Sequence, residues 1–459
     1  MTKAKIIWLV NTSLVICSAF ILCAALGMLF NPDAFHKFFS PVQLVPDHTL
    51  SFPHKSYYWD IKGYAQMALS NVCLAFYPLW PLLIRTLFHP QTIEQAAYSF
   101  LVFSTVILFI STPLLLNVFR KSFNHQYLAF LLVLAFSLNP MGIFRAIGYT
   151  ESFFSALTAI FIWLCLHQTN LNEKIRLVLV FGLTFIMSLT RPILLPFIFS
   201  SVAALGTIFY FERLKLETRD SRSLLNQINQ YAQEIKITVV LGISAFLGYC
   251  LYGSFCWRSR GNFFAPFTDQ KLWGTKFGLH LELLLFPKSP LFDLLGLYFP
   301  IIVLVLAITF VYFKTIDKTP LVWVPKSPLW NIFILYPPLL IFLYVFNYFR
   351  LKNKSTEGDG LLTRLQTSDY TKTLGKNYLF WFCVYFPVFH SVLIFFTRDR
   401  LYSLGRYIFG VPFFFVALGY LCCCVPGKKT YQALWWFIVI SAIALVEQWV
   451  NYGKNQWLG

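Results

Sequence analysis

Residues Ile6 to Phe30 read IIWLVNTSLVICSAFILCAALGMLF, an apolar run that contains no charged side chain. As an α-helix, a run of roughly 20 residues crosses a hydrocarbon core about 30 Å thick. Similar runs recur at Ala96–Val118, Phe130–Leu138, Thr150–Leu166, Leu177–Leu189, Ile193–Phe211, Ile237–Phe255, Leu291–Phe313, Leu329–Phe349, Tyr378–Phe396, Tyr407–Cys424 and Tyr431–Val450. Three of these runs are shorter than this length. They count as crossings only if flanking residues such as Asn124 to Ala129 extend them, or if they are the short arms of helical hairpins. The pattern predicts an all-α integral membrane protein with about 10–12 transmembrane helices.

The composition agrees with this class. Hydrophobic residues make up 58% of the 459 and charged residues 12%, against about 45–50% and about 25% in soluble domains. We therefore expect one polytopic membrane domain over residues 1–459. A cleavable signal peptide is not expected, because the first run is too long and Leu29–Pro32 is a poor cleavage site.

The net charge of +18, from 37 basic and 19 acidic residues, does not predict nucleic-acid binding. The basic residues lie in short loops between apolar runs, as the positive-inside bias expects, and form no dense stripe. This bias places the N-terminus and an amphipathic loop at about 212–236 in the cytoplasm, and the loops at about 31–95 and 256–290 on the exoplasmic side. Counting spans puts Arg350–Lys376 outside despite its six basic residues, so one span between Leu291 and Phe349 is miscounted or re-entrant.

The ten cysteines do not predict a disulfide framework. Most lie inside apolar runs, where a free cysteine behaves as a small hydrophobic residue. S-palmitoylation of Cys422–Cys424 is the alternative for that run. No CxxC or His-Cys cluster predicts a metal site.

A polar segment follows the first apolar run, with Tyr57-Tyr58-Trp59-Asp60 leading to Tyr64. A helix that begins near Asp60 places Tyr64 one turn further along the same face. Asp60 is then either a helix cap or first-turn acid, or a carboxylate available for chemistry at a membrane edge. Pro78 and Pro81 predict a broken or re-entrant helix rather than a simple span over Ala65–Phe88, with Arg85 emerging near the interface.

Two further corners carry polar residues. Asn139-Pro140 and Gly142 should break one span, and Thr150 or Glu151 should begin the next, where Glu151 is either a first-turn acid or a site residue. Thr190-Arg191-Pro192 holds an arginine at an abrupt turn. Its planar guanidinium suits a phosphate, although a snorkelling interfacial arginine is equally compatible.

Together these segments resemble the PIG-V mannosyltransferases, which add the second mannose in GPI-anchor synthesis and have bacterial relatives. The resemblance is carried, in the family's order, by Tyr58–Asp60, Ala75–Arg85 (AFYPLWPLLIR), Asn139–Pro140, Tyr149–Ser152, Thr190–Arg191, Gly261–Gly274, Gly405–Tyr407 and Pro412. The chain departs from the family's Gly-Asp-Pro segment, because Asn262 and Phe263 replace the acid and the proline. Asp269 is nearby but displaced.

The resemblance implies a GT-C architecture with its active site on exoplasmic loops. It implies transfer of mannose, or another hexose, from a polyprenyl- or dolichyl-phosphate carrier to a lipid-linked glycan, with Asp60 as general base and inversion at the anomeric carbon. Arg191 and Arg406 would neutralise the departing phosphate. The remaining substrate-binding residues on this reading are Trp59, Tyr64, Arg85, Glu151, Gln270 and Trp273, of which Trp59, Tyr64 and Trp273 would stack on sugar faces.

No cofactor is expected beyond the lipid-linked sugar donor. The expected partners are membrane lipids, that donor and a glycolipid acceptor, and a small membrane partner subunit is compatible with the reading. The membrane would be the plasma membrane in a bacterium or the endoplasmic reticulum in a eukaryote. The competing functions are a transporter or flippase of lipid-linked sugars, and a non-catalytic subunit of a membrane complex.

Overall fold

The computed structural model describes most of the chain. The described residues are 3–39, 60–70, 76–166, 171–216, 229–269, 271, 276–285, 291–315, 321–323, 362–364, 370–398, 400–456 and 458. The predicted span Leu329–Phe349 and most of the predicted amphipathic loop, including Leu224 and Ile228, lie outside these residues. So do Trp59, Gln270 and Trp273 of the predicted site.

Apolar helices form most of the described chain, which confirms the prediction of an all-α, multi-pass membrane protein. Within the described residues, seven helices are long and apolar enough to cross a membrane: α1 (Lys3–Phe30), α5 (Ile93–Phe123), α9 (Leu194–Leu216), α11 (Ala232–Arg260), α14 (Leu291–Thr315), α17 (Tyr378–Thr397) and α20 (Lys428–Gly453). Four shorter apolar helices are α4 (Leu79–Phe88), α6 (Gln126–Leu138), α7 (Glu151–Cys165) and α19 (Phe413–Cys424).

The other described helices are α8, with 16 residues, and several shorter ones. They are α2 (Pro32–Phe39), α3 (Asp60–Leu69), η1 (Pro140–Arg145), α8 (Glu173–Ser188), α12 (Ala265–Thr268), α13 (Glu282–Leu285), α16 (Tyr370–Leu374) and α18 (Leu404–Phe409). Two strands, β1 (Leu321–Trp323) and β2 (Leu362–Arg364), pair antiparallel with Val322 opposite Thr363. This strand pair was not predicted from the sequence.

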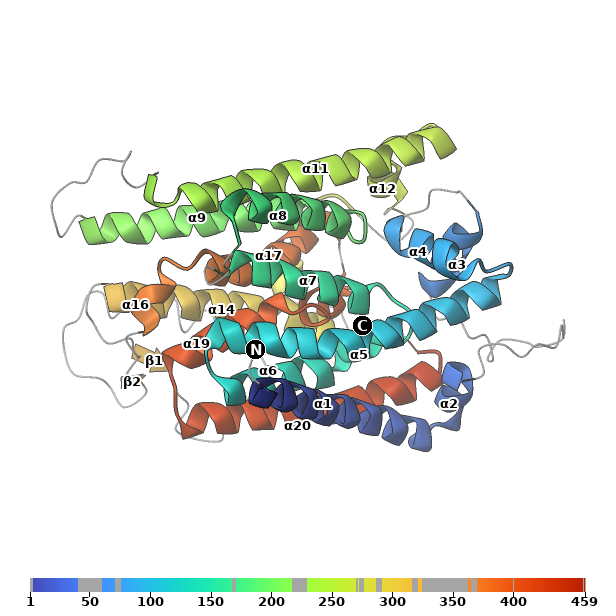
Figure 1. Cartoon of the computed structure of the whole chain (residues 1–459), viewed down its shortest axis with the longest axis horizontal. Helices are drawn as coiled ribbons and strands as arrows, with labels where there is room; N and C mark the ends of the chain where they lie inside the picture. The colour runs from blue at the N-terminus through green and yellow to red at the C-terminus, as the bar shows by residue number, and fades with distance from the viewer. Residues whose placement is uncertain are drawn as a thin grey trace.

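The long helices run roughly side by side in layers (Figure 1). Helices α8, α9 and α11 form one outer layer, α1 and α20 lie on the opposite side, and α5, α7, α14 and α17 lie between them. The interior is aromatic: Phe197, Phe382 and Phe413 pack with ring centroids 5.4–6.2 Å apart. On the outside, Leu14, Val15 and Leu22 of α1 are between 56% and 60% exposed. Such a surface suits lipid contact.

The bundle has two ends that differ in content. At one end, which we call the site end, α3, α7 and α9 begin and α11 and α17 finish (Figure 1). At the other, the far end, Lys376 Nζ lies 3.0 Å from Glu212 Oε1, and Tyr370 stacks on Tyr420. Residues 370–376 therefore lie at the far end, beside the last turns of α9 and α19. This agrees with the expectation, from charge, that the Arg350–Lys376 segment shares a side with the basic loops.

Helix breaks fall where proline and glycine predict them. The stretch from Ala65 to Phe88 forms two short helices, α3 and α4, with Pro78 immediately before α4. Asn139 ends α6 and its side chain caps η1 by accepting a hydrogen bond from the Met141 amide (2.9 Å). Residues from Gln126 onward do extend the short run at Phe130–Leu138 into a longer helix.

Two predictions need correction. The run Tyr407–Cys424 is not one span, because the chain breaks at Gly410–Pro412 between α18 and α19. Reading the cysteines as free hydrophobic residues fails at Cys256, which is disulfide-bonded near the site end of α11. The residues next to Cys256 in the sequence do not indicate this disulfide, because pairing depends on which cysteines lie close in the folded structure.

Candidate active site

Four charged side chains meet at the site end of the bundle. Arg406 Nη1 donates to Asp60 Oδ2 at 3.0 Å, and Arg406 Nε lies 2.9 Å from Glu151 Oε1. Arg191 Nη2 lies 3.2 Å from the same Glu151 oxygen. We call these four residues the charge cluster. Sequence reasoning nominated each of them separately, and the structure brings them together.

The charge cluster is almost entirely enclosed. The side chain of Glu151 is 0% exposed and those of Arg191 and Arg406 are 4% and 7% exposed, while Asp60 reaches 11%. Burial alone would lower the pKa of Arg406, but the carboxylates of Glu151 and Asp60 outweigh it and raise that pKa well above its ordinary value. With two positive and two negative groups, the cluster is formally neutral, as a buried set of charges must be to tolerate desolvation.

The contacts of Glu151 are close in distance but poorly aligned. Among the described residues, neither of its carboxylate oxygens has a partner that meets hydrogen-bond geometry, although two guanidinium groups lie within ion-pair distance. A buried carboxylate with unfilled hydrogen-bonding capacity is unusual in a protein interior. Glu151 thus organises the two arginines by charge rather than by a rigid hydrogen-bonded lattice.

Backbone features before α7 place Glu151. Gly148 has a φ of +94°, a conformation that glycine adopts readily. Its amide donates to Ser104 Oγ at 2.9 Å, and its carbonyl accepts from Trp80 Nε1 at 3.0 Å. These bonds tie the start of α7 to α4 and α5, which also explains why Trp80 is completely buried.

A close helix contact places Arg406. Gly405 packs against Gly296 of α14, where an added Cβ on Gly296 would lie 3.1 Å from the Gly405 Cα. The Gly405 amide donates to Asp293 Oδ1 at 2.7 Å. Asp293 was not predicted, although an acid inside the apolar run Leu291–Phe313 is the kind of residue that marks function or support in a membrane protein.

Aromatic rings surround the guanidinium groups. The Arg406 guanidinium lies 4.9 Å from the ring centre of Tyr149 and 5.4 Å from that of Tyr407. Arg191 lies 4.7 Å from the ring of Tyr407. Tyr64 packs on Phe76 at 4.8 Å and is only 5% exposed, and burial, reinforced by Asp60, raises its pKa far above the ordinary range. Tyr64 therefore supports the wall behind Asp60 and offers no open face for a sugar in this state.

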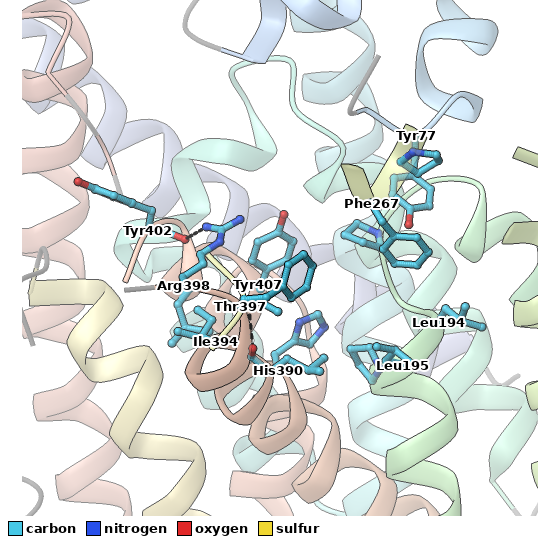
Figure 2. A pocket seen from close by; sticks show the side chains of 16 residues that line it. Tyr77, Leu194, Leu195, Phe267, His390, Ile394, Thr397, Arg398, Tyr402 and Tyr407 are labelled. Carbon is cyan, nitrogen blue, oxygen red and sulfur yellow. Dashed lines mark hydrogen bonds between the residues drawn. The ribbon is translucent and has the colours of Figure 1, made fainter. Parts of the chain in front are cut away.

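Figure 2 shows the lining of an apolar cavity of about 290 Å³, which adjoins the charge cluster through Tyr407. The Tyr407 ring lines the cavity and also contacts the Arg191 guanidinium. The walls come from the start of α9, from α12, from the last turns of α17 and from α18. The lining residues labelled in Figure 2 are Tyr77, Leu194, Leu195, Phe267, His390, Ile394, Thr397, Arg398, Tyr402 and Tyr407.

The remaining predicted residues have other positions. Arg85 lies in the last turn of α4, half-buried, and the ion pairs of the charge cluster do not include it. Asp269 pairs with Arg260, and Asn262 caps its own turn by accepting from the Phe264 amide at 2.9 Å. Neither residue of this loop joins the charge cluster.

Sequence reasoning also missed His390. This residue lies within the apolar run Tyr378–Phe396, and its ring stacks on Tyr407 with centroids 5.4 Å apart and an interplanar angle of 11°. A lone histidine in an apolar span was a usable signal. Among the residues that the structure describes, no group of three or more His, Cys, Asp or Glu side chains is arranged to hold a metal ion.

Comparison with known proteins assigns this chain to no family. No protein-family model matches the chain, and no curated protein does. Two solved structures of the Archaeoglobus fulgidus oligosaccharyltransferase are similar: one tethered to an acceptor peptide (11% identity, TM-score 0.38) and one with zinc and sulfate (12% identity, TM-score 0.30). They cover 97% and 91% of this chain, which spans 55% of the length of each. At these TM-scores the likeness assigns neither a fold family nor an activity.

Proposed function

We propose that the chain is a membrane glycosyltransferase of the GT-C type. It would move mannose, or another hexose, from a polyprenyl-phosphate carrier to a lipid-linked glycan acceptor. The observation that carries this proposal is the charge cluster, in which the Asp60 carboxylate is the less enclosed of the two acids, beside an apolar cavity at one end of a helical bundle. The sequence resemblance to the PIG-V mannosyltransferases supports the same reading.

Asp60 is the carboxylate best placed to act on a substrate. It is the most accessible acid of the cluster, while Glu151 is fully enclosed. In the proposed step, Asp60 takes the proton of an acceptor hydroxyl, whose oxygen forms a bond to the anomeric carbon. The bond from that carbon to the phosphate oxygen breaks, with inversion, and the polyprenyl phosphate leaves with the electron pair. General-base assistance of this kind is worth about 10²–10⁴-fold.

The two arginines hold the two carboxylates of the charge cluster in place. Arg406 touches both Asp60 and Glu151, and Arg191 balances the second charge on the Glu151 side. Arg406 therefore fixes the position of Asp60 Oδ2 for the proposed proton transfer.

The arrangement favours an enzyme over a carrier. The named charges gather at one end of the bundle, where a hydroxyl, a base and a lipid-linked donor can meet. The disulfide at Cys256 lies at this same end and supports an oxidising, exoplasmic environment for it. The identity of the sugar, a role in GPI-anchor synthesis, the acceptor and any partner subunit are parts of the proposal that rest on the resemblance alone.

The test is a transfer assay with the full-length protein in lipid vesicles. Polyprenyl-phosphate mannose labelled in the sugar is supplied together with glycolipids extracted from the source membrane. The proposal expects label to appear covalently attached to a glycolipid. Movement of the intact labelled donor across the bilayer without product would support the carrier instead, and binding without either would support a non-catalytic subunit.

A further inference from the structure

The charge cluster has no net positive charge left for a phosphate. Arg191 and Arg406 are balanced by Glu151 and Asp60 at distances of 2.9–3.2 Å. A donor phosphate brings at least one further negative charge into this enclosed place, where an uncompensated charge costs several kcal/mol. The phosphate of a lipid-linked donor therefore requires a cation outside the cluster.

Arg398 supplies such a cation in the wall of the cavity. It caps the C-terminal end of α17, lines the cavity and donates from Nη1 to the Tyr402 carbonyl at 2.8 Å. Within the described part of the chain, no carboxylate lies within ion-pair distance of its guanidinium. The Asp293 carboxylate interacts electrostatically with Arg398 from beyond ion-pair distance. One oxygen of the Asp293 carboxylate already accepts a hydrogen bond from the Gly405 amide.

His390 lies two turns earlier on the same helix and also faces the cavity. Its ring is held between Tyr407 (stacked, 5.4 Å) and Phe386 (edge-on, 4.7 Å). It also lines a smaller pocket with Arg191 and Pro192, so it lies between the cavity and the charge cluster. Figure 2 shows Arg398, Tyr407 and His390 along one wall, with the Arg398 side chain held by its bond to the Tyr402 carbonyl.

The rest of the cavity suits a hydrocarbon chain. Leu194 and Leu195 of α9 face Leu393 and Ile394 of α17 across it. Leu194 and Leu195 begin α9, and Leu393 and Ile394 lie on α17 between His390 and Arg398, so apolar and charged lining lie side by side at the site end. An isoprenoid chain against these apolar side chains and a phosphate at Arg398 match the two kinds of lining.

We propose that Arg398, assisted by His390, forms an anion subsite that binds the phosphate of a polyprenyl phosphate, with the prenyl chain in the cavity. This deepens the proposed function and rests on it. The subsite would hold the donor phosphate beside Tyr407 and so present the anomeric carbon toward Asp60. The same phosphate chemistry occurs in anionic phospholipid headgroups, which the experiment must separate.

The experiment measures ligand binding by the full-length protein in phosphatidylcholine nanodiscs. Geranylgeranyl phosphate and the uncharged alcohol geranylgeraniol are titrated in parallel. The wild-type protein should bind the phosphate at least about 10-fold more tightly than the alcohol. Because a hydrogen bond to a charged group contributes about 1.5–3 kcal/mol, Arg398→Gln should weaken phosphate binding about 10- to 100-fold and leave alcohol binding unchanged.

Matched variants separate binding from folding. His390→Phe keeps an aromatic ring against Tyr407 but removes the donors, and should weaken only phosphate binding, by less than Arg398→Gln does. Arg400→Gln removes an exposed arginine two positions away that does not line the cavity, and should bind both ligands as the wild type does. Arg398→Lys keeps the charge at the helix end and should recover part of the phosphate preference if Arg398→Gln has not simply disturbed the fold.

Each failure has a separate meaning. If the wild-type protein binds geranylgeranyl phosphate no more tightly than geranylgeraniol, the assignment of a polyprenyl-phosphate donor is overturned, and the proposed function with it. If the wild type distinguishes them and Arg398→Gln distinguishes them equally well, only the subsite assignment is overturned. If phosphatidylglycerol displaces geranylgeranyl phosphate at equal concentration, the subsite belongs to phospholipid headgroups and the donor assignment is overturned.

Discussion

At the scale of single residues, the site depends on Glu151 as much as on Asp60. One fully buried oxygen of Glu151 lies within 3.2 Å of two guanidinium groups. Arg406 in turn reaches Asp60. Glu151 therefore sets the position and charge of the arginine that holds the proposed base.

Replacing Glu151 by Gln should impair both stability and transfer. Removing one partner from a buried ion pair costs about 3–5 kcal/mol, and the released arginine would draw Asp60 out of position, so transfer should fall about 10²-fold or more. The measurement is the thermal unfolding midpoint and the transfer rate of the same purified protein. Glu94→Gln, an exposed first-turn acid of α5, is the control. A Glu151→Gln protein that matches this control would contradict the assigned role.

The sequence predicted the individual residues of the charge cluster but not which of them pair. Asp60 and Arg406 are 346 positions apart, and no local spacing indicates that they touch. Tyr64 illustrates the opposite error. Its position one turn after Asp60 was predicted correctly, but its burial depends on Phe76 and Tyr149 packing over it, which only the tertiary structure supplies.

At the scale of elements, short helices at the site end carry the functional side chains. Proline and glycine made several of these breaks predictable, because Pro78 and the Asn139-Pro140 pair cannot continue a regular helix. The break at Gly410–Pro412 was missed, since the apolar run Tyr407–Cys424 was long enough to read as one span. The short helix α18, which carries Arg406, was therefore not predicted, although Arg406 itself was.

The substitution Gly405→Ala should displace α18 from α14. Its added Cβ would lie 2.9 Å from the Phe292 carbonyl oxygen and 3.3 Å from Asp293 Oδ1. Overpacking of this kind costs about 1–3 kcal/mol. Because Arg406 is the next residue, transfer should fall more than stability does. Gly206→Ala in α9 meets no atom within 4 Å and serves as the control. Equal activity of the two variants would show that this contact does not position Arg406.

Helix α2 should give the protein a pH-dependent stability. Lys37 Nζ donates to the Tyr452 carbonyl at 2.9 Å, and burial lowers the pKa of Lys37 to about 7, from about 10.4 in an unfolded chain. Between these values the unfolded chain binds more protons, so stability should rise with pH from about 7 to about 10, by at most about 1.4 kcal/mol per unit. Unfolding midpoints across that range measure this. Lys37→Met should flatten this rise of stability with pH, whereas the control Lys454→Met should keep it. An unchanged slope in Lys37→Met would refute the role given to Lys37.

At the scale of the whole molecule, the two ends of the bundle should face opposite sides of the membrane. Hydropathy predicted the helical membrane fold because a chain in lipid must satisfy its backbone hydrogen bonds internally. Charge predicted the side on which residues 370–376 lie, whereas span counting put them on the other side. The predicted span Leu329–Phe349, on which that count depends, lies outside the described residues.

Labelling of single introduced cysteines tests the orientation. Ser259→Cys lies exposed at the site end of α11, and Asn124→Cys lies exposed at the far end of α5. In intact cells or sealed right-side-out vesicles, a membrane-impermeant maleimide should label position 259 directly and position 124 only after permeabilisation. The unsubstituted protein gives the background from its own free cysteines. The reverse pattern would place the charge cluster on the cytoplasmic side.

The most direct test of the central claim is the effect of Asp60→Asn on transfer, with donor binding measured on the same preparation. Asn keeps the size of the side chain but cannot accept the hydroxyl proton. We predict that Asp60→Asn remains folded and binds polyprenyl-phosphate mannose, while its rate of sugar transfer falls at least about 10²-fold. Transfer at the wild-type rate by a folded Asp60→Asn protein would contradict the account.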